Sequence, residues 1–265
     1  GNTPLAALLA PSSGADSLRY PSLPGVFHLR AGAAEEASAA VLHLDTVGTS
    51  TYALISQDDA LGASGHERLM VELTRIAIRP IANVRVAVSP RGLELKRVVA
   101  EVCAARPEAL VLAVDATTAS LIVEEGKKQR CAAQYLVFSE TGAALAAQEP
   151  SANGRHPLAG VLVTQVVPHP NNNRHPIVAE YQRALAAQNS SGSSYPSVEG
   201  YLIVRVLQET LSTCVRDISR TCLLRILRSN TLELPGLRVH FGEDQRQSRP
   251  FVEITLLDDQ GRFLR

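Results

Sequence analysis

Short apolar runs alternate with helical patterns through the middle of the chain, and this alternation restricts the fold more strongly than any other feature. Runs with the length of buried strands occur at 52–55, 84–88, 110–114 and 135–138. Amphipathic patterns between them predict helices over 93–105 and 118–128, and a first helix that follows the loop 57–62 and ends at Pro80. Leu69, Met70, Leu73 and Ile76 lie on one side of this first helix. Strands that are separated by such helices form a parallel sheet covered on both faces. The sequence therefore predicts an α/β fold.

The second half of the chain continues this pattern and then changes period. A strand is predicted at 160–167, followed by a crossover rich in proline and asparagine at 168–176. Helices are predicted at 177–188, 198–211 and 220–228. Apolar and polar residues then alternate at 237–241 and 251–256, and Asp258–Gly261 forms a turn. We expect a β-hairpin-like ending on the α/β body.

The charges of the chain balance, because 26 basic and 26 acidic side chains give a formal net charge of zero. This argues against a nucleic-acid-binding protein, whose affinity depends on Lys and Arg that neutralise phosphates. No apolar run approaches the roughly 18 residues of a membrane helix, so direct membrane insertion is not expected. No signal peptide is visible, but a mature exported protein would look the same, so the compartment stays open.

Four cysteines are present, and none of them forms a C-x-x-C pair or has a histidine at metal-ligand spacing. A metal site is therefore not expected. Cys214 and Cys222 flank a short polar stretch between two helical patterns, where a disulfide and two free thiols both remain open. Cys103 lies on an apolar helix face and is predicted to be buried and inert.

The sequence contains no phosphate-binding, dinucleotide-binding or zinc-protease motif and no nucleophile elbow, so neither an enzyme nor a cofactor is expected. Gly62–His66 has some likeness to a nucleophile elbow, but its second glycine comes one place early, and Ser64 is predicted to lie in the first turn of a helix. Asp58 and Asp59 form either an acid pair or a solvated loop with a helix cap. The second interpretation is favoured, because adjacent strand residues point to opposite faces.

Six segments, in the same order along the chain, resemble the leucine/isoleucine/valine-binding family of type I periplasmic binding proteins. They are Leu8–Arg19, Phe27–Arg30, Ile55–Gly62, Arg106–Leu112, Pro196–Tyr201 and Asp259–Phe263. Each segment is a weak signal alone, and their common order carries the resemblance.

The resemblance implies two α/β lobes joined by three crossovers, with a ligand in the cleft at the carboxyl ends of the strands. Lobe one would hold 1–44 and 167–237, and lobe two would hold 45–166 and 238–265. The family normally has further strands and helices before the segment that resembles Gly1–Pro4, so the first part of lobe one is expected to be missing. An open sheet edge would then be exposed, and we expect poor stability or pairing through that edge.

The carboxylate of the ligand is expected at Pro11–Ala15, which follows a strand and enters a helix. Exposed amides and a hydroxyl at such a place favour an anion. The resemblance points to Ser13 with the amides of Gly14 and Ala15. The alternative is that Ser12 and Ser13 only cap the helix.

The remaining candidate residues follow other strands. The resemblance places Glu140 where the family often has an acid that meets an ammonium group, and a carboxylate in a cleft needs either such a cation or solvent. Asp115 and Thr117 end the 110–114 strand and are expected to face the same cleft. Leu61 stands where relatives often carry an aromatic residue that packs on the ligand.

The function that the resemblance implies is that of a periplasmic solute-binding protein of an ABC importer. It would bind an amino acid or a similar small carboxylate and deliver it to an ABC transporter permease by closing its lobes. The alternative is a ligand-sensing receptor domain of the same fold that acts in signalling or regulation, since fold does not decide function.

Overall fold

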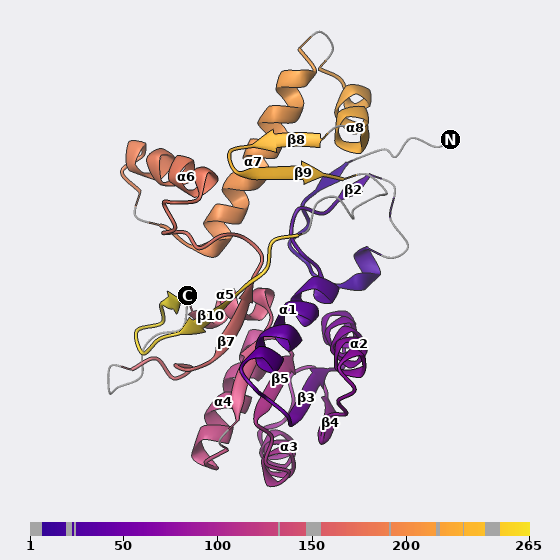
Figure 1. Ribbon diagram of the computed structural model, residues 1–265, viewed down its shortest axis with the longest axis vertical. Helices are drawn as coiled ribbons and strands as arrows, with labels where there is room; N and C mark the ends of the chain where they lie inside the picture. Colours follow the sequence, from indigo (N-terminus) through magenta and orange to yellow (C-terminus); the bar gives the residue numbers. More distant parts are fainter. Residues whose placement is uncertain are drawn as a thin grey trace. The chain divides into compact units, whose positions relative to one another are not determined.

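The computed structural model describes residues 7–19, 23, 25–131, 133–146, 155–190, 192–215, 218–229, 231–241 and 250–265. Its contacts divide the chain into two compact units (Figure 1). Unit 1 comprises Gly1–Ser12, Leu18–Ala31 and Val166–Phe251. Unit 2 comprises Ser13–Ser17, Gly32–Gln165 and Val252–Arg265. Each unit is described by itself.

Unit 2 is built on a seven-stranded sheet with the strand order β11-β10-β7-β6-β5-β3-β4. Its strands are β3 Tyr52–Gln57, β4 Ala82–Val86, β5 Ala109–Ala113, β6 Gln134–Val137, β7 Leu162–Gln165, β10 Glu253–Leu257 and β11 Phe263–Leu264. The strands from β7 to β4 are mutually parallel, while β10 is antiparallel to both β7 and β11. The α/β fold with a mostly parallel sheet is therefore confirmed.

The helices of unit 2 cover both faces of this sheet (Figure 1). They are α1 Ala33–Thr46, α2 Ala60–Arg75, α3 Gly92–Ala104, α4 Ala116–Lys128 and α5 Ser139–Ala146. Side chains of β3 alternate between the faces: Tyr52 and Leu54 pack with α1 and α2, whereas Ala53 and Ile55 pack with α3 and α4. All residues of β3 are buried, as expected for a central parallel strand.

The described residues of unit 1 form two small sheets and three α-helices. Its elements are β1 Leu8–Leu9, β2 Val26–Phe27, α6 Pro176–Ala187, α7 Tyr195–Thr213, α8 Arg220–Ser229, β8 Thr231–Leu234 and β9 Leu237–His240. The chain passes from unit 2 to unit 1 within a short 3-10 helix, Asp16–Leu18. Strands β1 and β2 are parallel, and β8 and β9 form an antiparallel hairpin.

Helix α7 begins at Tyr195, three residues before its predicted start at 198. The Ser194 side chain accepts a hydrogen bond from the Ser197 amide, and the Ser197 side chain accepts one from the Ser194 amide. This reciprocal cap satisfies two amides that would otherwise lack partners, and a proline in the first turn fits a position that needs no N–H. No helix among the described residues is long and apolar enough to cross a membrane.

The predicted lobes differ from the two units in four places. Residues 13–17 and 32–44 lie in unit 2, and Val166 and residues 238–251 lie in unit 1. The difference at 32–44 has a clear cause, because the buried face of α1 (Ala37, Ala40, Val41 and Leu44) packs with β3 and α2. The predicted turn at Asp258–Gly261 is confirmed, because it joins the antiparallel strands β10 and β11. The strand predicted at 237–241 does not pair with this ending, since β9 pairs with β8.

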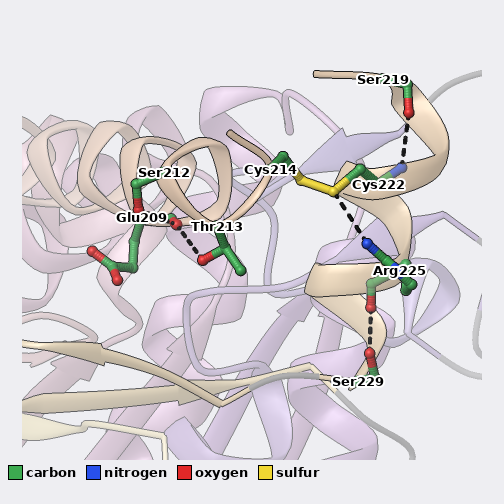
Figure 2. Close-up of a disulfide and its surroundings, with 8 residues drawn as sticks. All are labelled: Glu209, Ser212, Thr213, Cys214, Ser219, Cys222, Arg225 and Ser229. Carbon is green, nitrogen blue, oxygen red and sulfur yellow. Dashed lines mark hydrogen bonds between the residues drawn. A yellow bond between two sulfur atoms is a disulfide. The ribbon is translucent and has the colours of Figure 1, made fainter. Parts of the chain in front are cut away.

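Each disulfide joins two cysteines of the same unit, one disulfide in unit 1 and the other in unit 2. Cys214, which follows α7, is bonded to Cys222 in α8, so the disulfide left open by the sequence forms (Figure 2). The backbone of Cys222 also donates a hydrogen bond to Ser219, and Arg225 donates one to the Cys222 sulfur.

The prediction that Cys103 is buried and inert was wrong, because Cys103 is partly exposed and bonded to Cys131. The turn after α4 brings Cys131 to the end of α3, with a Cα–Cα distance of 5.3 Å.

Candidate ligand-binding site

The carboxyl ends of the five neighbouring parallel strands of unit 2 lie at one edge of the sheet. Strand β4 follows β3 on one side, and β5 then returns to the other side of β3. The strand order therefore reverses between β3 and β5. In open α/β sheets, ligands bind outside the carboxyl ends of the strands at such a reversal.

Hydrogen bonds join the ends of β3 and β5 at this reversal. The Asp115 amide donates to Gln57 Oε1 at 3.2 Å, and Gln57 Nε2 donates to Asp59 Oδ2 at 2.8 Å. Gln57 is buried, so its amide group fixes the two loops that follow these strands. Sequence reasoning missed Gln57, because a single glutamine at a strand end carries no distinctive pattern.

The aspartates after β3 and β5 begin the following helices. Asp59 Oδ1 accepts the Gly62 amide at 2.8 Å, which confirms the helix-cap interpretation for Asp59. Asp115 Oδ1 accepts the Thr118 amide at 2.8 Å and begins α4 in the same way. A carboxylate oxygen that is used as a cap holds the local backbone in place, so Asp115 has a structural role at the strand end.

Two other candidate residues lie beside these caps. Thr117 is exposed in the first turn of α4, and Leu61 is half-buried in the first turn of α2. Both side chains therefore lie at the start of a helix that leaves the carboxyl end of a strand.

The loop Ser13–Ala15 contacts the end of β6. The Gly14 amide donates to Glu140 Oε2 at 3.2 Å, although the two residues are 126 positions apart in sequence. Glu140 lies in the first turn of α5, directly after β6. The structure thus brings together two of the predicted residues from distant segments. It also shows that the Gly14 amide binds a carboxylate, here that of the protein itself.

Further contacts hold this loop against unit 2. The Ala15 amide donates to Ser13 Oγ at 3.3 Å, and the Asp16 amide donates to Ser64 Oγ at 3.0 Å. The Gly14 carbonyl oxygen accepts the Ala33 amide at 3.0 Å. Ser64 is buried on the first turns of α2, so it has a structural role there rather than that of an exposed nucleophile.

Sequence reasoning missed a second acid near this loop, Glu36 of α1. Its side chain is buried and accepts hydrogen bonds from the amide and hydroxyl groups of Ser139, at 2.8 and 3.0 Å. The Thr164 hydroxyl also donates to this carboxylate. The only available signal was a tandem glutamate, Glu35–Glu36, before an apolar helix, which is also typical of a solvated helix start.

Two surface hollows of unit 2 lie elsewhere, and none of the predicted site residues lines them. One is lined by Ala63, His66, Glu67, Met70, Val71, Thr74, Arg75 and Arg85 of α2 and β4. The other is lined by Arg91, Leu93, Glu94, Arg97, Val98 and Glu101, at the start of α3 and along it. The described residues contain no group of three or more His, Cys, Asp or Glu side chains that could hold a metal ion.

Comparisons with solved structures identify the same fold in bacterial binding proteins. An extracellular ligand-binding receptor from Verminephrobacter eiseniae has a TM-score of 0.81 at 22% identity, over 98% of this chain and 73% of its own. A substrate-binding periplasmic protein from Ralstonia solanacearum has a TM-score of 0.77 at 24% identity, over 97% and 72%. A possible leucine/isoleucine/valine-binding protein from Rhodopirellula baltica has a TM-score of 0.77 at 21% identity, over 98% and 71%.

At these identities the likeness to solved structures shows the fold. A search among curated proteins found no match. The model of the periplasmic binding protein family matches residues 4–259, which is nearly the whole chain. The chain therefore belongs to the type I periplasmic binding protein family.

Proposed function

We propose that this protein is the solute-binding component of an ABC importer and binds an amino acid or a similar small carboxylate. Membership of the periplasmic binding protein family supports a ligand-binding role. Other proteins of the same fold include an amino acid ABC transporter substrate-binding protein from Pseudomonas fluorescens. In this proposal the ligand binds between two lobes, which close on it and present it to a permease.

The contact between Gly14 and Glu140 is the observation that carries the proposal. An amide that already binds a carboxylate lies 3.2 Å from an acid that could receive a cation. An α-amino acid carries both complementary groups. Its carboxylate would replace that of Glu140 at the Gly14 amide, with further donors from Ser13 and the Ala15 amide. Its ammonium group would bind the released Glu140, so neither charge would be left without a partner.

The other candidate residues would complete this site. Thr117 presents an exposed hydroxyl at the end of β5, while Asp115 holds the β5–α4 turn as a helix cap. Leu61 would offer an aliphatic surface where relatives often have an aromatic ring. A ligand with an aliphatic or small side chain therefore suits this position better than one that needs ring stacking.

We further propose that the protein works in the periplasm. Both disulfides support this proposal, since disulfides persist in oxidising compartments such as the periplasm and are rare in the cytosol. All four cysteines of the chain are used in these two bonds.

A thermal-shift screen tests the ligand class. The full chain is melted with each of the twenty standard amino acids and with the carboxylic acids that lack the α-amino group. We expect at least one amino acid to raise the melting temperature progressively as its concentration rises. At 100 times its Kd, it should stabilise the folded protein by about 2.7 kcal/mol. The combined variant Ser13→Ala and Glu140→Gln should lose this shift.

The control for this screen is Glu101→Gln, which changes an exposed acid on α3 that takes no part in the proposed site. It should keep the full ligand-dependent shift. If amino acids have no effect on the unaltered protein while neutral amides stabilise it, the proposed ligand class is wrong.

A further inference from the structure

The two edges of the seven-stranded sheet of unit 2 differ in length. One edge strand, β11, has two residues, and the other, β4, has five. Among the described residues, β4 pairs with β3 alone. An edge strand presents N–H and C=O groups that can pair with another strand, and a very short edge strand limits this pairing. Strand β4 is therefore the edge at which a further strand can be added.

The backbone groups of β4 point alternately toward β3 and toward the open edge. The Ile81 amide, directly before β4, donates to the Tyr52 carbonyl oxygen of β3 at 2.8 Å. Because successive residues of a strand alternate in direction, the backbone groups of Ala82 and Val84 face the open edge. Strand β4 contains no proline, so both of these residues keep an amide donor.

Large apolar side chains are exposed along this edge. Ile81 and Val88, which stand before and after β4, are 44% and 56% exposed. Val71 of α2 is 42% exposed, and it lines the hollow beside α2 together with Met70 and with Arg85 of β4. Exposed apolar side chains that gather among polar ones are typical of a surface that binds another protein.

The side chains of β4 that face α2 are polar. His66 Nε2 and Asn83 Oδ1 are 3.0 Å apart, and Asn83 Nδ2 donates to Met70 Sδ at 3.8 Å. Side chains two residues apart in a strand share a face, so Arg85 lies on the same face of β4 as Asn83. Arg85 therefore belongs to the face of the sheet on which α2 packs.

Two opposite charges lie on this surface. Glu67 of α2 and Arg85 of β4 are both exposed and line the same hollow. Neither forms an ion pair with another residue that the structure describes, whereas Arg75 in the same hollow is 3.0 Å from Glu72. A surface that carries both an acid and a base is complementary to itself, because a two-fold axis brings each residue to its counterpart on the other copy.

We infer that the open edge of β4 and the hollow beside α2 form the contact between two copies of this chain. Strand β4 pairs antiparallel with the partner's β4 about a two-fold axis, so that the two sheets become one continuous sheet. Val84 lies opposite the partner's Val84, because its backbone groups face the open edge. Glu67 binds the partner's Arg85. This inference does not depend on the proposed ligand, since no predicted ligand-binding residue lies on this surface.

Exchange of the two charges tests the contact between Glu67 and Arg85. Sedimentation equilibrium of the full chain over a range of concentrations gives the Kd of the dimer. Arg85→Glu and Glu67→Arg each bring like charges together, so each should raise this Kd at least about tenfold. The double variant restores opposite charges, and its Kd should return close to that of the unaltered protein.

A second pair of variants tests the apolar part of the contact. Val71→Ser should raise the Kd of the dimer about tenfold, because the apolar surface of Val71 is buried twice in a symmetric dimer. The matched control is Leu121→Ser on α4, since Leu121 is exposed to the same extent, 42%, and lies away from this surface. It should leave the Kd unchanged. Circular dichroism checks that all variants fold.

Hydrogen exchange tests the pairing of the strands. In protein labelled with ¹⁵N-valine, exchange of the Val84 amide should slow as the protein concentration rises through the Kd of the dimer. The Val88 amide lies outside β4 and should show no such change. Val84→Ile and Val88→Ile identify the two signals by their loss.

Three results would overturn the inference. The first is a protein that stays monomeric up to about 1 mM. The second is a dimer whose Kd neither single charge reversal changes, because such a dimer forms through another surface. The third is a double variant that remains as weak as the single variants, or a Val84 amide whose exchange does not depend on concentration, since the strands and charges then do not meet as inferred.

Discussion

Two glycines in helices have opposite surroundings. A Cβ atom on Gly65 of α2 would lie 2.7 Å from Ala113 Cβ and 2.8 Å from Phe138 Cε2, closer than real Cβ atoms approach. A Cβ atom on Gly200 of α7 would have no neighbour within 4 Å. Glycine at position 65 therefore allows α2 to pack closely on β5 and on Phe138, the residue after β6. Glycine at position 200 only adds flexibility to the unfolded chain.

We expect Gly65→Ala to lower the free energy of unfolding by about 1–3 kcal/mol, because overpacking shifts the helix away from the sheet. Gly200→Ala should raise it by about 0.5–1 kcal/mol through the higher helix propensity of alanine. Urea denaturation of both variants measures these changes. Equal effects of the two substitutions would contradict the close packing at Gly65.

Tyr52 places a hydroxyl group in the core without a hydrogen-bond partner among the described residues. Burial is the main reason that the pKa of Tyr52 rises from 10 to about 12, and the nearby charges of Asp45 and Glu108 add to the shift. The folded state therefore disfavours the phenolate. The stability that depends on neutral Tyr52 is complete below pH 10 and is lost as the pH rises toward 12.

Tyr52→Phe removes the unpaired hydroxyl and its titration. We expect the free energy of unfolding to rise by about 1 kcal/mol at neutral pH, with a larger advantage over the unaltered protein above pH 10. Tyr201→Phe is the comparison, since the Tyr201 hydroxyl donates to Glu180 at 2.7 Å. That variant should be destabilised at neutral pH. A destabilised Tyr52→Phe would mean that its hydroxyl has a partner.

The two disulfides act on separate elements and close loops of different length. Cys103–Cys131 joins α3 to the segment before β6 with a separation of 28 residues, and Cys214–Cys222 joins α7 to α8 with a separation of 8. A cross-link stabilises mainly by restricting the unfolded chain, so the longer loop should contribute more.

Serine variants of each cysteine pair test this expectation. Loss of Cys103–Cys131 should lower the free energy of unfolding by about 3–4 kcal/mol, and loss of Cys214–Cys222 by about 2–3 kcal/mol. Denaturant titration gives these values, and mass spectrometry after thiol alkylation shows whether each bond is present in the unaltered protein. Alkylated cysteines without prior reduction would contradict the disulfide assignment.

An element can be predicted from the sequence when its apolar and polar residues follow a clear pattern. The strands β3, β5 and β6 were predicted because short continuous apolar runs between helical patterns are typical of buried parallel strands. Helix α1 was not, because it is rich in alanine and Glu36 lies on its buried face. Helix α5 was also missed, since it is short and begins directly after β6.

The candidate site was predictable where it follows strand ends. Gly14 and Glu140 were both named from the sequence, and the structure joins them with a hydrogen bond. Gln57 and Glu36 could not be found in this way. Their roles depend on which segments meet in three dimensions, and a buried polar residue leaves no periodic signal in the sequence.

At the scale of the whole molecule, the assignment of segments to units depends on long-range packing. The sequence predicts two α/β lobes only through the family resemblance, and it places 32–44 in the first lobe. Contacts place that helix in unit 2, together with the loop 13–17. As a result, all seven predicted ligand-binding residues lie in one unit: Ser13, Gly14, Ala15, Leu61, Asp115, Thr117 and Glu140.

The most direct test of the proposed amino-acid site is a nuclear magnetic resonance titration of the full chain labelled with ¹⁵N-glycine. The chain has 17 glycines, and Gly14→Ala, which meets only ordinary contacts, identifies the Gly14 signal by its loss. We predict that the amide signal of Gly14 shifts saturably as the amino acid from the thermal screen is added, because the ligand carboxylate replaces Glu140 there. Binding of that amino acid with an unchanged Gly14 signal would contradict the proposed site.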